Sequence, residues 1–167
     1  ARNAWDYSNT NYVVLGMLVE QATGHTLAAE IHQRILAPLE LRETYVVPED
    51  AVAGEQAHGF SKSDDQTEVA MSFTFGAANI VTTVGDLRRF GEALFEARLL
   101  EPDTLDTMEQ FVDGKGQYDM PELEYGLGLM RSRLPVGGED EADTVAEASR
   151  VVGHIGGFGG FRAALWY

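Results

Sequence analysis

The sequence predicts an α+β fold in which helices come first and part of an antiparallel sheet follows. Two observations predict it. Apolar residues recur at three- and four-residue spacing through much of the first two thirds, and short apolar runs punctuated by glycine fill the last third. We therefore expect one domain over residues 1–167, mainly helical over 1–112 and with sheet strands over 124–167. Its 44% apolar composition is ample for a core.

Two helices near the N-terminus are predicted from periodicity and from their end signals. Residues 10–22 place apolar side chains on one helical face, and Gly24 supplies a C-terminal stop. Thr26 can cap a second helix, because threonine at this position accepts a hydrogen bond from a backbone N–H of the first turn. This second helix is expected to end before Pro38.

The middle of the chain is predicted as a long loop followed by two further helices. Residues 43–78 show no sustained period, and their glycine and polar residues are typical of loops. Thr83 and Asp86 have the spacing of a capping box and predict the start of a strong helix. Pro102 predicts a short helix after it, since proline is favoured in a first turn.

The last third is predicted to form strands. Residues 125–130 suit a strand that another backbone approaches closely, because glycines punctuate an apolar run. The acidic residues 137–143 are expected to form a turn or a disordered loop. Residues 156–160 predict a hairpin turn that needs positive φ, leading into a closing strand over 161–167. This strand stops without an exit loop and residue 1 is not methionine, so truncation at both ends is expected.

Composition argues against several classes of function. The formal net charge of −15 argues against nucleic-acid binding, which clustered lysines and arginines drive. The absence of cysteine excludes disulfides and thiolate metal sites, and the four histidines lack metal-ligand spacing. No apolar run approaches the roughly 20 residues that span a bilayer. We therefore expect no metal, no cofactor and no membrane span in this chain.

Two short patterns are candidates for chemistry. Tyr7-Ser8-Asn9 lies near the start of the chain, and His154 is followed by Ile155, Gly156 and Gly157 near its end. Taken alone, both have ordinary explanations: an asparagine before a helix is usually a cap, a tyrosine usually packs, and a histidine among glycines is often a polar turn residue. Their surroundings strengthen the functional interpretation.

Five ordered segments resemble the penicillin-recognising serine hydrolases: Tyr7–Gly24, Ile35–Leu41, Gly76–Phe90, Tyr125–Leu129 and Gly153–Gly157. That family includes penicillin-binding proteins, class C β-lactamases, D-Ala-D-Ala carboxypeptidases, D-aminopeptidases and related esterases. The resemblance covers nearly the whole chain and implies a β-lactamase/transpeptidase-like fold, an antiparallel sheet covered by helices with a second helical region. It further implies an acyl-enzyme mechanism and an extracytoplasmic location, periplasmic or secreted.

The resemblance also implies roles for individual residues. Tyr7 would shuttle a proton between nucleophile and leaving group, and Asn9 would hydrogen-bond the substrate or a motif lysine. His154 would occupy the place of the strand's Lys or His, and a cation there would favour the phenolate of Tyr7. Gly156 and Gly157 would form the oxyanion and substrate-binding strand, with the Gly157 N–H as an oxyanion donor.

The chain departs from the family's pattern at two places. No serine here is followed by lysine three residues later, so the Ser-x-x-Lys motif is absent. We therefore expect the nucleophile to lie outside this chain and the chain alone to be inactive. Ile155 stands where many members have Thr or Ser, which weakens the case for a substrate with a free carboxylate. Arg162 can supply a positive charge instead, or face solvent.

The leading hypothesis is part of a serine hydrolase that acts on peptide, β-lactam or ester acyl groups. The first alternative is a non-catalytic ligand-binding homologue, and the second is one chain of a split enzyme. In each case the expected partner is a small-molecule or peptide acyl compound. Incomplete sheet edges also predict self-association or pairing with a complementing fragment.

Overall fold

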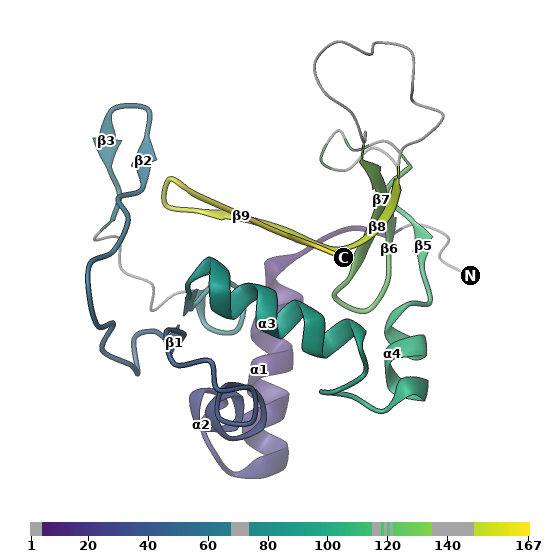
Figure 1. Cartoon of the computed structure of the whole chain (residues 1–167), viewed down its shortest axis with the longest axis horizontal. Helices are drawn as coiled ribbons and strands as arrows, with labels where there is room; N and C mark the ends of the chain where they lie inside the picture. Colours follow the sequence, from purple (N-terminus) through teal and green to yellow (C-terminus); the bar gives the residue numbers. More distant parts are fainter. Residues whose placement is uncertain (1–4, 68–73, 115–117, 119, 121, 135–148) are drawn as a thin grey trace. The chain divides into compact units, whose positions relative to one another are not determined.

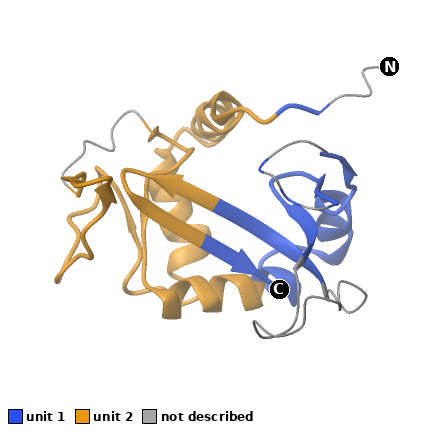
Figure 2. Cartoon of the chain, turned by 90° about the horizontal axis from the view of Figure 1, so that it is seen from above, with its two compact units in different colours: residues 1–6, 94–155, 164–167 blue, residues 7–93, 156–163 orange. Residues whose placement is uncertain are grey.

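The computed structural model describes residues 5–67, 74–114, 118, 120, 122–134 and 149–167. It confirms the α+β class, with helices in the first part of the chain and an antiparallel sheet in the last (Figure 1). The chain divides into two compact units, coloured blue and orange in Figure 2. Unit 1 comprises Ala1–Asp6, Leu94–Ile155 and Ala164–Tyr167, and unit 2 comprises Tyr7–Ala93 and Gly156–Ala163.

Helix α1 of unit 2 agrees closely with its prediction. It runs over Asn9–Thr23, one residue longer at each end than expected. Gly24 ends it in the left-handed conformation, and the Gly24 N–H donates to the carbonyl of Glu20 at 2.9 Å. The local end signal was therefore sufficient to place this helix.

The second helix is capped as predicted but changes its winding. Helix α2 spans Leu27–Ile31, and the Thr26 hydroxyl accepts a hydrogen bond from the Ala29 N–H at 3.2 Å. The helix then continues as a π-helical turn, η1, over His32–Leu36, and it ends before Pro38. Periodicity alone did not predict the π turn, because one wider turn leaves the apolar spacing almost unchanged.

The loop predicted over residues 43–78 contains three short strands, so that prediction is wrong in part. Strand β1 (Tyr45–Val46) pairs antiparallel with β4 (Ile80–Val81), and β2 (Phe60–Ser61) pairs antiparallel with β3 (Asp64–Asp65). Two-residue strands are too short to show a period, and their existence depends on a distant or turn-linked partner.

The core of unit 2 lies around the second helix. Buried side chains from α2, η1 and the following segment meet there, with partly buried apolar neighbours packed against them. The buried members are Ala28, Leu36, Leu41 and Val46.

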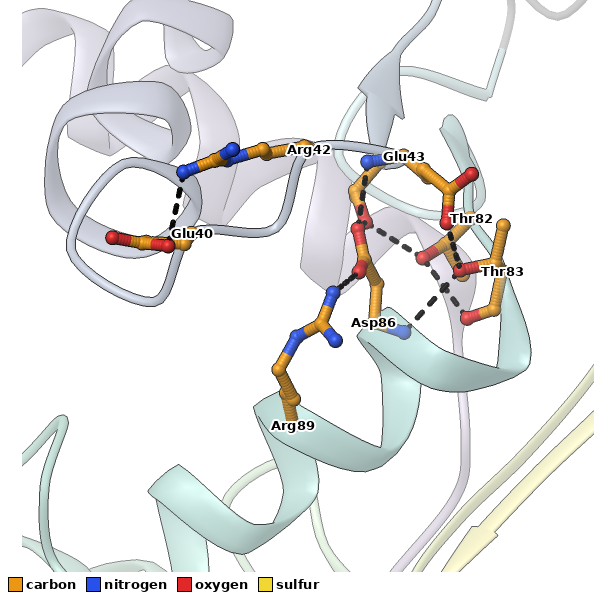
Figure 3. Close-up of polar contacts among 8 residues, drawn as sticks. Glu40, Arg42, Glu43, Thr82, Thr83, Asp86 and Arg89 are labelled. Carbon is orange, nitrogen blue, oxygen red and sulfur yellow. Dashed lines mark hydrogen bonds and ion pairs between the residues drawn. The ribbon is translucent and has the colours of Figure 1, made fainter. Parts of the chain in front are cut away.

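Helix α3 (Val84–Phe95) begins at the predicted capping position. The Thr83 hydroxyl accepts a hydrogen bond from the Asp86 N–H at 3.3 Å, as a helix cap does. The Asp86 carboxylate, which has 0% exposure, binds a different segment (Figure 3). It accepts hydrogen bonds from the Glu43 N–H at 2.8 Å and the Thr44 hydroxyl at 2.9 Å, and it pairs with Arg89. This carboxylate therefore ties the start of α3 to the segment before β1.

The five-stranded sheet has the order β5-β6-β7-β8-β9, and helix α4 (Pro102–Met108) precedes it in the chain as predicted. Neighbouring strands from β5 to β8 pair antiparallel. The strands are Val112–Asp113, Glu124–Tyr125, Met130–Leu134, Ser149–Phe158 and Phe161–Trp166. Among the residues described, no helix is long and apolar enough to cross a membrane.

The single strand predicted over residues 125–130 is interrupted: Tyr125 ends β6, Met130 begins β7, and residues 126–129 form a tight turn between them. The Gly126 N–H donates to the Leu129 carbonyl at 2.8 Å and closes that turn. The predicted close approach of another backbone is confirmed, because a side chain at Gly126 would collide with the Met108 carbonyl.

The hairpin predicted before the closing strand is confirmed at its tip. Gly159 and Gly160 have φ of 52° and 82° and connect β8 to β9. Gly156 and Gly157 lie within β8 rather than in the turn. The acidic residues 137–143 lie outside the described residues.

Candidate functional site

Tyr7 and Asn9 lie in unit 2 at the beginning of α1. Ser8 occupies the N-cap position, with φ of −144° and ψ of 125°, and Asn9 is the first helical residue. Because Ser8 holds the N-cap position, Asn9 is not the cap that its residue type would ordinarily suggest, and its side chain is exposed. The half-buried ring of Tyr7 packs against Tyr12, with centroids 5.8 Å apart.

His154 lies in unit 1 on strand β8, and both of its ring nitrogens have partners. Its Nδ1 is 2.5 Å from the carbonyl oxygen of Ile155, and its Nε2 is 2.9 Å from the hydroxyl of Tyr125. The Tyr125 and His154 rings meet edge to face with centroids 5.7 Å apart. The Trp5 ring stacks on Tyr125 with centroids 4.4 Å apart. The predicted strand histidine therefore packs against the Tyr125 ring, which in turn stacks on Trp5.

Burial lowers the pKa of His154, and the hydrogen bond with the Ile155 carbonyl opposes that effect more weakly. An unperturbed histidine has a pKa of about 6.5, so a lowered value leaves the ring neutral at pH 7. The site therefore opposes the cationic role that the sequence suggested for His154.

The predicted oxyanion strand carries Gly156 and Gly157, which are exposed residues of β8 assigned to unit 2. A Cβ at Gly157 would lie 3.3 Å from a guanidinium nitrogen of Arg162, so this arginine lies beside Gly157 across the hairpin. Arg162 is itself exposed and has no ion-pair partner within the part of the chain that the structure describes. The hairpin thus presents a cation beside a candidate oxyanion donor.

Tyr125 is the residue whose role sequence reasoning missed. It belonged to a recognised segment, but nothing in its local sequence indicated a partner 29 residues away. The strand register supplies the reason: Tyr125 pairs with Met130, and Met130 pairs with Gly153, the residue before His154. Two pairing steps across the sheet therefore bring these two segments, far apart in sequence, close together.

Within the described ranges, no group of three or more histidine and acidic side chains could hold a metal ion. A hollow on unit 2 is lined by residues of η1 and the segment around β1, including His32, Tyr45 and Asp50. None of the five predicted site residues lines it.

Comparison with known proteins identifies a family. The family described as Beta-lactamase matches residues 1–167. A D-aminopeptidase of Brucella ovis is 25% identical over 173 residues, which cover 98% of this chain and 29% of that protein. These findings confirm the predicted resemblance, while the regional bounds 1–112 and 124–167 stay a prediction.

Solved structures agree with that result. A D-stereospecific amidohydrolase from Streptomyces sp. has a TM-score of 0.82 and 31% identity, covering 98% of this chain and 46% of that one. A D-amino acid amidase from Ochrobactrum anthropi SV3 has a TM-score of 0.77 and 27% identity, covering 92% of this chain and 43% of that one. This confirms the β-lactamase/transpeptidase-like fold. The chain spans less than half the length of each of these proteins.

Proposed function

This chain belongs to the Beta-lactamase family, and we propose that it supplies part of the active site of a serine hydrolase that works through a seryl acyl-enzyme. The observation that carries the proposal is the family match over residues 1–167. By the resemblance of the sequence, Tyr7 and Asn9 would stand at the family's second motif and His154–Gly157 at its third. The relatives reported above are hydrolases by name: a D-aminopeptidase, a D-stereospecific amidohydrolase and a D-amino acid amidase.

In the proposed reaction a serine outside residues 1–167 attacks the substrate carbonyl. Its proton passes through Tyr7 to the leaving group, the bond to that group breaks, and water then hydrolyses the ester on the serine. Asn9 would hydrogen-bond the acyl amide or a motif lysine. The Gly157 N–H would stabilise the oxyanion, to which one donor contributes about 3 kcal/mol.

The substrate class we favour is an amide or peptide of a D-amino acid, ahead of β-lactams and esters. The names of the relatives support this, since three of them refer to D-amino-acid or D-stereospecific substrates. Ile155 supports it too, because its side chain has no hydroxyl to donate to a substrate carboxylate. We also propose an extracytoplasmic location, as for the penicillin-recognising enzymes it resembles.

The test compares residues 1–167 with the natural protein that contains them, using D- and L-phenylalanine p-nitroanilide and intact-mass detection of acyl adducts. We expect D-selective release and a serine adduct only where a Ser-x-x-Lys is present. Tyr7→Phe should reduce release by roughly 100-fold or more, as loss of a proton-transfer group does. Tyr12→Phe, a change to the neighbouring ring, is the matched control.

Two outcomes would contradict the proposal. Release by the 167-residue chain alone would show that the nucleophile lies within it. A protein that carries Ser-x-x-Lys but gives neither release nor an adduct would rule out the acyl-enzyme mechanism for these substrates.

Two other functions have specific support. A ligand-binding homologue is favoured by the absence of Ser-x-x-Lys and by the neutral state of His154. One chain of a split enzyme, or self-association, is favoured by four large apolar side chains of α1 that are about half exposed: Val14, Leu15, Met17 and Leu18. Mass spectrometry of native material distinguishes them, since a split enzyme co-purifies with a fragment that contains Ser-x-x-Lys.

A further inference from the structure

Tyr125 is a buried residue whose hydroxyl points at the candidate site. Its side chain is 5% exposed, so its hydroxyl needs a partner inside the protein. That partner is the Nε2 of His154 at 2.9 Å. The stacked Trp5 ring at 4.4 Å restricts the Tyr125 ring from the other side. The hydroxyl is therefore presented to the imidazole by a ring with little freedom.

The hydrogen positions follow from the chemistry of the two partners of His154. A carbonyl oxygen can only accept, so the contact between Nδ1 and Ile155 requires the hydrogen on Nδ1. In a neutral ring the Nε2 then carries a lone pair, and the Tyr125 hydroxyl is the donor to it. Burial favours this neutral form over the imidazolium.

We propose that Tyr125 is a positioning residue for His154, holding the imidazole as the neutral tautomer with its hydrogen on Nδ1 and its Nε2 lone pair occupied. Its relevance to catalysis rests on the proposed function, while the tautomer is a property of the chain itself.

This arrangement would change which groups supply the positive charge and the oxyanion donors in the proposed reaction. In the proposed reaction a neutral His154 would supply no positive charge to favour a phenolate, and its Nε2 would offer no N–H to an oxyanion. A cation that favours the phenolate would then have to come from another group, such as Arg162 or a lysine outside the strand motif, and the oxyanion donors would be backbone N–H groups such as that of Gly157. His154 would then be an uncharged polar side chain held in one orientation.

The tautomer can be read directly on the 167-residue chain by ¹⁵N-histidine labelling at pH 7.5, with His154→Gln assigning the resonances. We expect Nδ1 at the pyrrole-type position, Nε2 at the pyridine-type position, and a coupling from Nε2 to a slowly exchanging Tyr125 hydroxyl proton. A wild-type His154 with its hydrogen on Nε2, or carrying both hydrogens, would overturn the proposal. This readout is independent of turnover, so it stands or fails separately from the proposed hydrolase activity.

A second measurement tests the part played by Tyr125. Tyr125→Phe keeps the ring that stacks on Trp5 and removes only the hydroxyl, so the fold should persist. We expect the Nε2 resonance to move toward the average of the two tautomers, because the lone pair loses its donor. Tyr118→Phe, at an exposed tyrosine of the same unit, should leave the His154 spectrum unchanged. An unchanged spectrum in Tyr125→Phe would show that the Ile155 carbonyl alone sets the tautomer, and it would also overturn the proposal.

Discussion

The carboxylate of Asp86 in unit 2 and the imidazole of His154 in unit 1 are both polar groups held inside the protein, but their partners differ. Asp86 has 0% exposure, and its carboxylate pairs with Arg89 and accepts hydrogen bonds from the Glu43 N–H and the Thr44 hydroxyl. His154 is half-buried, burial favours its neutral form, and its partners are a phenol and a carbonyl. A buried charge surrounded by donors and a cation is typical of structural support, whereas a neutral, titratable ring near the surface is typical of a working site.

The largest effect on stability is expected from removing the Asp86 carboxylate. Asp86→Ala leaves the Glu43 N–H without its acceptor and leaves the Thr44 hydroxyl with only Thr82 at 2.7 Å, and an unsatisfied buried group costs about 1–3 kcal/mol. We expect the free energy of unfolding to fall by about 3 kcal/mol, measured by urea denaturation. Arg89 adds little to this because its side chain is 45% exposed.

A control for this prediction lies on the same helix. Glu92→Ala removes an exposed pair with Arg88 at i,i+4 spacing, for which a loss of about 0.3–0.5 kcal/mol is typical. If the free energy of unfolding fell by a similar amount in both variants, the buried contacts of Asp86 would stabilise the fold no more than an exposed ion pair does.

Sequence reasoning succeeded where the determining interaction was local. Gly24, Thr26 and Thr83 act on backbone groups within four residues of themselves, so their helix ends were predicted correctly. The family and its antiparallel sheet were also predicted correctly, from five segments that resemble that family in the same order along the chain.

It failed where the determining partner was distant in sequence. Asp86 was predicted as part of a helix cap, but its carboxylate binds residues more than 40 positions earlier. Tyr125 and His154 are 29 residues apart, and only the strand register brings them together. The two-residue strands β1 to β3 depend in the same way on pairing rather than on propensity.

The second prediction concerns the pH dependence contributed by His154. Because burial lowers its pKa in the folded state, the folded protein binds fewer protons there than the unfolded chain does. The contribution to stability is present above the unfolded pKa of about 6.5 and is lost as pH falls toward the lowered folded value. The slope for one proton is at most about 1.4 kcal/mol per pH unit.

Urea denaturation at a series of pH values from 7.5 downward measures this loss. His154→Gln removes the titrating ring and should flatten the profile in that window. A wild-type slope that survives in His154→Gln would assign the pH dependence to another group.

The smallest effect is expected at Asp65, a charged group that is neither buried nor at the candidate site. Hydrogen bonds from the Thr67 hydroxyl and N–H, followed by one from His58, lower the pKa of Asp65 to about 2. The interaction favours the folded state above the unfolded pKa of about 3.9 and is lost as pH falls through the folded value. The interaction should therefore be fully present near neutral pH and cause no change of stability with pH there.

An NMR titration of Asp65 distinguishes the two partners. Thr67→Val removes the hydroxyl, which is the larger cause, so it should raise the pKa of Asp65 more than His58→Gln does. The reverse order would mean that the charge of His58 dominates. Asp65 would then resemble Asp86, whose carboxylate pairs with the cation of Arg89. The two carboxylates would differ only in their burial.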